Sequence, residues 1–320
     1  MKKYIDLSSD PGFKMTFGDP DCPELILGLL RNLIPEREIA SVEFLNTESF
    51  GEEDEKTTRF DILCHEPDGA YFVVEMQKNK YDYFTDRLVV YAGSPLKHLL
   101  KKGEDYTFVK PLYIVSILDY VLRLPGESEE DSRKLVRRSR LCMEDTGAVL
   151  SNKLNYIFLQ MPLIRNLVGG EAFLEKWSYA VRNMSGFEER PRELEGAYFD
   201  RLFERSDRDN IRKDKLSKYD KMLRDEIQIE AEKRCAVREA REEGLAEGLE
   251  QGQKQGLKQG LEQGQKQGLK QGLEQGQKQG LKQGMEQGQR ESARNLKSLG
   301  VDIEIICKAT GLSKEQVEAL

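Results

Sequence analysis

Two apolar runs separated by a short turn stand out in the first third of the chain. Residues 60–66 and 70–77 are rich in apolar side chains, and a Pro-Asp-Gly triplet at 67–69 lies between them. Proline presets φ for a type I turn, aspartate favours the turn, and glycine accepts the left-handed conformation that closes a three-residue loop. The pattern predicts a β-hairpin in which Glu66 pairs with Ala70.

Apolar periodicity predicts several further elements in the first two hundred residues. Up to residue 119 their order is helix, three strands, helix, strand, which predicts a mixed α/β fold with an αβββαβ core. More strands and helices follow this core. The expected helices are 23–33, 84–102, 173–184 and 194–203, and the expected strands besides the hairpin are 39–46, 111–119 and 154–159. We expect acidic loops at 51–56 and 125–131.

The second half of the chain changes character and carries a repeat. From Gly244 to Gly288, glycine occupies every fourth position, with a twelve-residue unit seen cleanly at 256–267 and 268–279. Each glycine costs about 1 kcal/mol in a helix, so an isolated helix is marginal. A helix whose glycine and leucine stripe supports a homo-oligomer, a flexible polar spacer, and an expanded repeat without a selected role all remain open. Short helices are expected at 293–299, 302–309 and 313–320, with Ser313 and Gln316 as a capping box.

These changes in sequence pattern along the chain predict four structural parts. A globular domain spans residues 1–205, a charged helical connector 206–243, the repeat 244–291 and a small helical tail 292–320.

The amino-acid composition limits the classes of protein to which this chain can belong. The 320 residues include 50 Lys and Arg against 57 Asp and Glu, a net charge of −7, so any surface for nucleic acid must be local. The five cysteines are scattered without a C-x-x-C pair, which indicates neither a zinc site nor a disulfide framework. No apolar run approaches 18 residues. These features predict a cytoplasmic protein with no membrane segment.

The hairpin register carries the candidate chemistry. Counting outward from the turn places Asp61 opposite Glu75, on the same face as Gln77. Two carboxylates this close need a proton or a cation, and oxygen ligands suit Mg²⁺ or Mn²⁺. Such a metal activates water and stabilises charge on a phosphoryl group. Ordinary surface acids on a solvent-facing hairpin give the same spacing, so the spacing leaves both interpretations open.

Longer segments favour the first interpretation. Asp61 and Glu75-Met76-Gln77 resemble the Asp…Glu-x-Lys core of the PD-(D/E)XK nucleases, with Gln77 in the lysine position. The surrounding sequence resembles the Rpn-like recombination-promoting nucleases, a family also described as transposases. The segments that carry this resemblance are 10–18, 59–63, 74–77, 87–91, 154–162 and the tail after Gly300.

The resemblance implies a restriction-endonuclease-like fold and a metal-dependent DNA endonuclease that hydrolyses phosphodiester bonds, with a link to recombination or mobile elements. On this basis Asp61 and Glu75 hold the metal, the Met76 carbonyl assists, and Gln77 orients the attacking water. Gln77 cannot supply positive charge, which implies reduced or differently organised activity.

Four further residues are expected to support the site. Asp10 and Lys14 share a face if their segment is helical, and a surface ion pair is the alternative. Arg87 and Tyr91 form a second i, i+4 pair that could orient Glu75 or a phosphate, or simply pack on the sheet.

The densest basic cluster follows the second acidic loop and is the candidate for contacts to DNA phosphates, with solvated surface as the alternative. It consists of Arg133, Lys134, Arg137, Arg138 and Arg140.

Two rival functions remain. In the first, a catalytically weak DNA-binding or assembly protein uses its repeat and tail. The second is a serine or cysteine hydrolase. The sequence argues against it, because neither His65 nor His98 has a nucleophile motif beside it.

Overall fold

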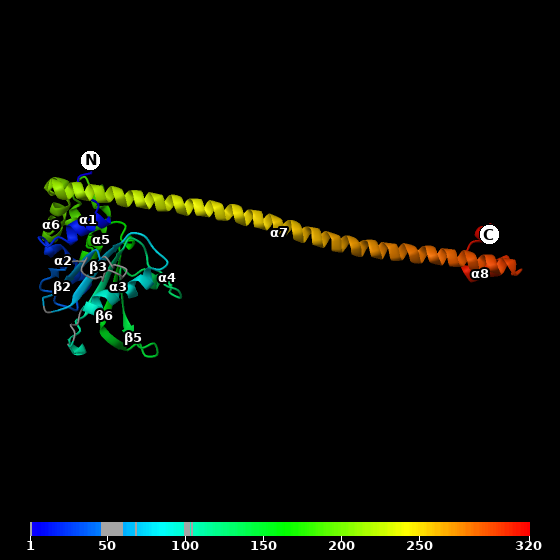
Figure 1. Ribbon diagram of the computed structural model, residues 1–320, viewed down its shortest axis with the longest axis horizontal. Coiled ribbons are helices and arrows are strands. Elements are labelled where there is room, and N and C mark those ends of the chain that lie inside the picture. Colours follow the sequence, from blue (N-terminus) through cyan, green and yellow to red (C-terminus); the bar gives the residue numbers. More distant parts are fainter. Residues whose placement is uncertain (1, 46–59, 68, 99–102, 104) are drawn as a thin grey trace. The chain divides into compact units, whose positions relative to one another are not determined.

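The computed structural model describes residues 2–45, 60–67, 69–98, 103 and 105–320. The chain divides into two compact units, Met1–Glu230 and Ala231–Leu320. The first unit has a mixed α/β architecture built around one sheet, and the second is helical (Figure 1). The predicted loop at 51–56 and the last residues of the helix predicted to reach 102 lie outside the described residues.

Within the described residues, the sheet has six strands in the order β1-β2-β3-β4-β6-β5. β1, β2 and β3 are antiparallel neighbours, and β3, β4 and β6 run parallel, while β5 is antiparallel to β6. The parallel step from β3 to β4 needs a crossover, which α3 supplies. The strands are β1 Glu43–Phe44, β2 Ile62–His65, β3 Tyr71–Gln77, β4 Leu112–Leu118, β5 Val136–Cys142 and β6 Val149–Gln160.

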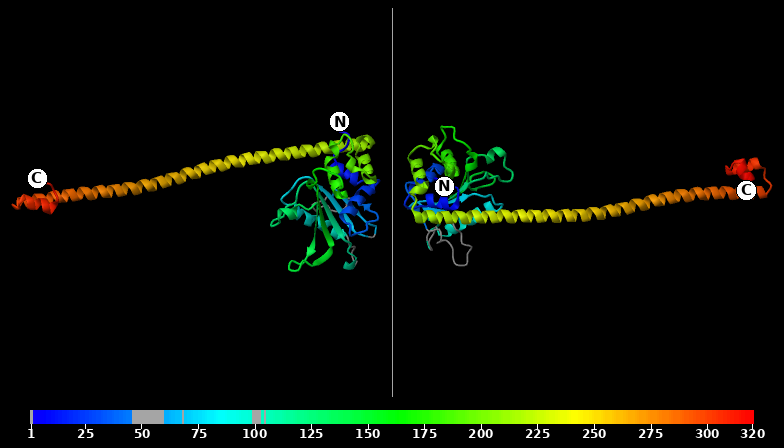
Figure 2. Two further views of the ribbon diagram at one scale, coloured as in Figure 1. Left: turned by 180° about the vertical axis from the view of Figure 1, so that it is seen from behind. Right: turned by 90° about the horizontal axis from the view of Figure 1, so that it is seen from above.

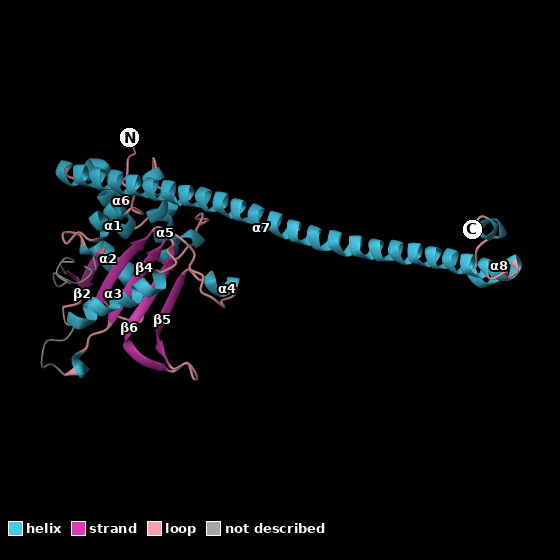
Figure 3. Ribbon diagram, turned by 45° about the vertical axis from the view of Figure 1, so that its right-hand side comes forward, coloured by secondary structure: helices cyan, strands magenta, loops and turns pink. Residues whose placement is uncertain are grey.

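Helices cover both faces of this sheet. One core cluster joins one strand face to α1, α2, α5 and α6, and a second cluster joins the other face to α3. Figure 3 shows α3 lying across the strands. These helices are α1 Asp10–Phe17, α2 Pro23–Leu33, α3 Phe84–His98, α5 Phe173–Asn183 and α6 Ala197–Ser206. Because side chains alternate along a strand, Phe72 and Val74 of β3 face the first cluster, and Val73 faces α3.

The predicted hairpin register is confirmed. Ile62 pairs with Val74 and His65 with Tyr71, so the same register places Asp61 opposite Glu75. Next to the turn, the N–H of Glu66 donates to the carbonyl of Ala70 over 3.0 Å. Asp68 of the turn lies outside the described residues.

The strand predicted at 39–46 is wrong over its first residues, because β1 begins only at Glu43. The guanidinium of Arg31 accounts for this difference. It donates to the carbonyl of Ile39 over 2.7 Å and to that of Ala40 over 2.9 Å. Carbonyls held by a side chain from α2 do not extend a strand ladder. The loop predicted at 125–131 also ends in a short helix, α4 Glu129–Ser132, whose N-cap is Ser128.

After α6 the chain enters α7, which spans Lys213–Ser298 and includes the whole repeat. Its first turns belong to the first unit and lie beside α1, as both views of Figure 2 show. In the second unit, α8 Ile303–Thr310 and α9 Lys314–Glu318 pack on the end of α7 around Ala293, Ile306 and Val317. The capping box predicted at Ser313 and Gln316 is confirmed.

No helix among the described residues has the length and apolar character needed to cross a membrane.

Candidate active site

The backbone of the hairpin holds two acidic side chains together. Asp61 precedes β2, and its N–H donates to Glu75 Oε1 over 3.1 Å. In return, Asp61 Oδ2 accepts a hydrogen bond of 2.8 Å from the N–H of Met76. Both side chains are buried, with 10% of the Asp61 side chain and 4% of the Glu75 side chain exposed. The antiparallel register therefore produces a fixed pair of carboxylates.

A lysine from α1 supplies the nearest positive charge. Lys14 Nζ lies 3.0 Å from Asp61 Oδ1 and 2.8 Å from Asp10 Oδ1, so it bridges the two carboxylates. The start of α1 is fixed by the Ser9 hydroxyl, which caps the N–H of Gly12 over 3.2 Å. A side chain at Gly12 would collide with the carbonyl oxygen of Asp6, so glycine permits this close approach.

A second cation approaches from α3 on the other side of Glu75. Arg87 Nη2 donates to Gln77 Oε1 over 2.8 Å and lies 3.8 Å from Glu75 Oε2. Gln77 Nε2 donates to the same Glu75 oxygen over 3.2 Å. The Arg87 guanidinium also lies over the Tyr91 ring, 4.8 Å from its centroid. Arg87 thus orients both Glu75 and Gln77, and Tyr91 supports Arg87.

Burial shifts the acid–base properties of this group. Burial raises the pKa of Asp61 to about 6, although Lys14 opposes the change. Burial and the neighbouring charge of Asp61 raise the pKa of Glu75 well above its usual range. Burial would lower the pKa of Lys14, but Asp61 and Asp10 outweigh it and raise that pKa above its ordinary value. Burial also raises the pKa of Tyr91 to about 12.

The donor set fits a hard divalent cation. Two buried carboxylates supply the oxygen ligands that Mg²⁺ and Mn²⁺ prefer. Each carboxylate oxygen that accepts one protein hydrogen bond retains a second lone pair. Ser116 lies opposite Glu75 on β4, and its buried hydroxyl has no hydrogen-bond partner in the described part of the protein. Among the described residues, no group of three or more His, Cys, Asp or Glu side chains is arranged to hold a metal.

The predicted basic cluster lies apart from this site, and most of its members are engaged within the chain. Arg133 pairs with Glu129, Lys134 with Asp131, and Arg137 with Glu127, while Arg138 donates to the carbonyl of Leu33 over 2.8 Å. Arg138 pairs with Ile157 across the strands, so its side chain and that of Arg140 lie on the sheet face opposite Glu75. Their contact with phosphates stays a prediction.

One acid beside the site was missed by the sequence analysis. Glu226 of α7 lies 3.8 Å from Lys78 Nζ, immediately after β3, and the next residue, Asn79, donates to Glu230 over 3.0 Å. Burial raises the pKa of Glu226, with Lys78 opposing the change. Glu226 sits in a strongly charged helix, where nothing in the sequence separates it from its neighbours.

Neither histidine lies in a catalytic arrangement that the structure describes. His65 stacks on Tyr71 with ring centroids 5.2 Å apart, and its Nδ1 lies 2.7 Å from the carbonyl of Glu66. The side chain of His98 lies outside the described part of the chain.

Comparison with known proteins adds one match. The family model of the PD-(D/E)XK nuclease family transposases matches residues 7–233, which include the whole site and the sheet. No curated protein and no solved structure matches the chain.

Proposed function

Because this chain belongs to the PD-(D/E)XK nuclease family transposases, we propose that it is a metal-dependent DNA endonuclease that hydrolyses phosphodiester bonds. The observation that carries the proposal is the buried pair of Asp61 and Glu75, fixed by reciprocal backbone hydrogen bonds and bounded by Lys14 and Arg87. We propose that it acts in the cytoplasm and promotes recombination or is associated with mobile elements.

In this proposal Asp61, Glu75 and the Met76 carbonyl hold Mg²⁺ or Mn²⁺. When bound, the metal acidifies a water molecule and neutralises charge on the phosphoryl oxygens. Gln77 orients the attacking water through its amide. Its oxygen is held by Arg87 and its nitrogen by Glu75, so the amide orientation is fixed by its two partners.

We assign to Lys14 the positive charge that Gln77 cannot provide. Family members with Asp…Glu-x-Lys place a cation two residues beyond the glutamate, whereas this chain has a neutral amide there. The Lys14 ammonium lies 3.0 Å from Asp61 and stays protonated because its pKa is raised. An ammonium fixed beside a buried carboxylate stabilises developing negative charge without reorganisation. Asp10 and Arg87 are positioning residues for Lys14 and Glu75.

Nicking of supercoiled plasmid in the presence of Mg²⁺ tests the proposal. We expect Asp61→Ala and Glu75→Ala to abolish nicking, because each removes half of the carboxylate pair. Glu43→Ala is the matched control, since Glu43 is an exposed acid of the same sheet. Equal nicking by the wild type and Asp61→Ala would assign the activity to another site or a contaminant.

The same variants separate this proposal from a catalytically weak DNA-binding protein. That alternative predicts DNA retention that survives Asp61→Ala and Glu75→Ala, together with no nicking by the wild type and no effect of metal on thermal stability.

A further inference from the structure

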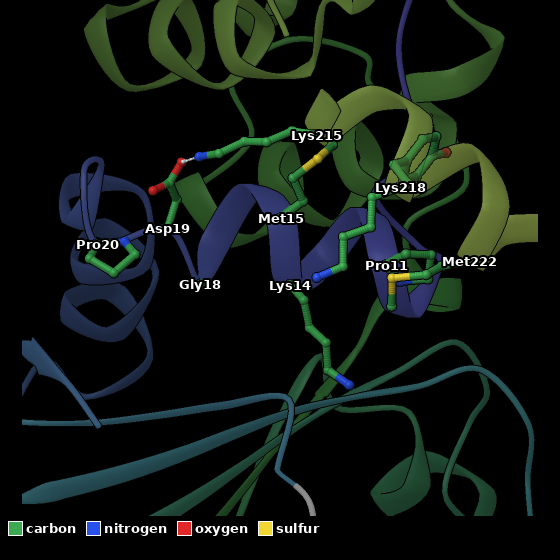
Figure 4. Close-up of a pocket in the computed structure, with 10 residues that line it drawn as sticks. Pro11, Lys14, Met15, Gly18, Asp19, Pro20, Lys215, Lys218 and Met222 are labelled. Carbon is green, nitrogen blue, oxygen red and sulfur yellow. Dashed lines mark hydrogen bonds and ion pairs between the residues drawn. The ribbon is translucent and has the colours of Figure 1, made fainter. Parts of the chain in front are cut away.

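A second site-like feature lies between α1 and the first turns of α7, within the first unit. Figure 4 shows this cavity, which we name the α1–α7 pocket. Its volume is about 370 Å³, within the range of roughly 300–1,000 Å³ that is typical of small-molecule sites. Its lining residues are Pro11, Lys14, Met15, Gly18, Asp19, Pro20, Lys215, Lys218, Tyr219 and Met222.

The walls of the pocket combine an apolar floor with lysines. The apolar lining, which we call the floor, includes Met15, Tyr219 and Met222 together with two prolines. Tyr219 is buried, and its hydroxyl accepts a hydrogen bond of 2.9 Å from the N–H of Asp6, so its ring is fixed. Methionine side chains are flexible and polarisable, and they adapt to the flat faces of aromatic ligands. The floor therefore suits a planar, apolar group.

The charges at the pocket are predominantly positive. Asp19 is the acid among the lining residues, and it is already engaged by Arg205 as well as by Lys215 at 3.3 Å. Lys218 is exposed and makes no ion pair within the described residues. In Figure 4 the Lys218 side chain extends from α7 toward α1. A ligand with negative charge next to a planar apolar group would complement these walls.

Lys14 connects the pocket to the candidate active site. Its stem lines the pocket, while its ammonium lies 3.0 Å from Asp61. Figure 4 shows the side chain running from α1 toward the strands. Lys14 is therefore a residue that the pocket and the candidate active site share.

We infer that the α1–α7 pocket binds one nucleotide of a single-stranded DNA segment adjoining the scissile phosphate. A base packs on Met15 and Met222, and a neighbouring phosphate contacts Lys218. A duplex exposes only the edges of its bases, whereas an unpaired strand exposes their faces. This inference rests on the proposed nuclease function and adds to it a preference for single-stranded DNA beside the cleavage point.

Binding of a short fluorescein-labelled oligothymidine, measured by anisotropy in EDTA and in an Asp61→Ala background, tests the inference without requiring cleavage. We expect Lys218→Glu and Met222→Glu each to weaken binding about tenfold, since a base–side-chain stack or a phosphate contact is worth roughly that much. Lys213→Glu makes the same charge change on an exposed residue of α7 outside the pocket and should leave affinity within about twofold.

A matched duplex probe should be affected by Lys218→Glu but little by Met222→Glu, because its base faces are hidden. Equal losses for Lys213→Glu and Lys218→Glu, or no loss for either pocket variant, would overturn the inference.

Photocrosslinking with an iodouracil-substituted oligonucleotide adds a readout that does not depend on any pocket variant folding. Crosslinks on Met15 or Met222 support the pocket, and crosslinks confined to other segments refute it. Both assays are independent of nicking. Failure of the nuclease proposal would appear as equal nicking by Asp61→Ala, and failure of this inference would appear as binding that ignores the pocket.

Discussion

The side chains of Asp61 and Glu75 are held side by side, because each accepts a hydrogen bond from a backbone N–H on the opposite arm of the hairpin. The N–H of Asp61 donates to Glu75 Oε1 over 3.1 Å. The N–H of Met76, the residue after Glu75, donates to Asp61 Oδ2 over 2.8 Å. Each carboxylate is thus oriented before any ligand arrives. Such preorganisation lowers the reorganisation that binding or catalysis requires.

The proposed role of Lys14 predicts that a lysine at position 77 can partly replace the Lys14 ammonium. Lys14→Ala should lower the rate of plasmid nicking about 100-fold, the usual cost of removing one preorganised donor. Adding Gln77→Lys to that variant should restore about tenfold of the rate, because it returns an ammonium to the side of Glu75. Initial nicking rates measure both effects.

Lys213→Ala serves as the control for loss of a surface lysine. The assignment of Lys14 is refuted if Lys14→Ala nicks DNA as fast as this control.

Metal binding should stabilise the folded protein through the same two acids. At a Mg²⁺ concentration one hundred times the dissociation constant, the gain in unfolding free energy is about 2.7 kcal/mol. We expect thermal unfolding of the wild type to shift upward with Mg²⁺, and the shift to disappear in Asp61→Ala. Glu43→Ala should retain it. A shift of the same size in Asp61→Ala would place the ion elsewhere.

The raised pKa of Asp61 makes stability depend on pH in the metal-free protein. The folded state holds the Asp61 proton up to about pH 6, whereas the unfolded state releases it near the ordinary aspartate pKa of 3.8. Between these values the folded state binds more protons, so the free energy of unfolding falls as pH rises. The loss attributable to Asp61 is on the order of 3 kcal/mol at most.

Urea unfolding in EDTA at several pH values between 4 and 7 measures this effect as the difference between the wild type and Asp61→Asn. The variant should lose less stability as pH rises. Parallel pH profiles for the two proteins would contradict the assignment.

The glycines of the repeat should limit the stability of α7. A methyl group added at Gly260, Gly264, Gly268 or Gly272 meets no neighbouring atom within 4 Å. Alanine at these positions should therefore stabilise the helix by about 1 kcal/mol each through lower backbone entropy in the unfolded chain. Circular dichroism of a peptide spanning 241–295 should show a clear rise in helix content when all four are replaced. Unchanged helicity would mean that the glycines are not limiting.

The spacing of the apolar residues argues against a continuous coiled coil along the repeat. Leucines or methionine occur in pairs at 245 and 249, 257 and 261, 269 and 273, and 281 and 285. Twelve residues advance a helix by about 1,200°, so each pair points about 120° away from the previous one. The exposed pairs spiral round the helix instead of forming one seam. We expect the same peptide to sediment as a monomer, and a stable oligomer would contradict this geometry.

The sequence predicted the hairpin and its register because both depend on neighbours in the chain. A Pro-Asp-Gly turn and alternating side chains determine which residue of β3 faces Asp61, and the structure agrees. The strand predicted at 39–46 was wrong in its first residues because a side chain from α2, Arg31, takes the carbonyls of Ile39 and Ala40. The local pattern of apolar residues cannot predict that contact, because its two partners belong to different elements.

By itself, then, the sequence determined the acidic pair, the Gln77 substitution and the twelve-residue repeat, since each follows from residue order and strand or helix period. Only the tertiary structure decided that Lys14 bridges Asp10 and Asp61, that Arg87 holds Gln77, and that α7 closes a lysine-lined pocket against α1. These relationships join elements far apart in the chain. They arise from the packing of helices on the sheet, which buries apolar faces and in doing so fixes where the charged side chains meet.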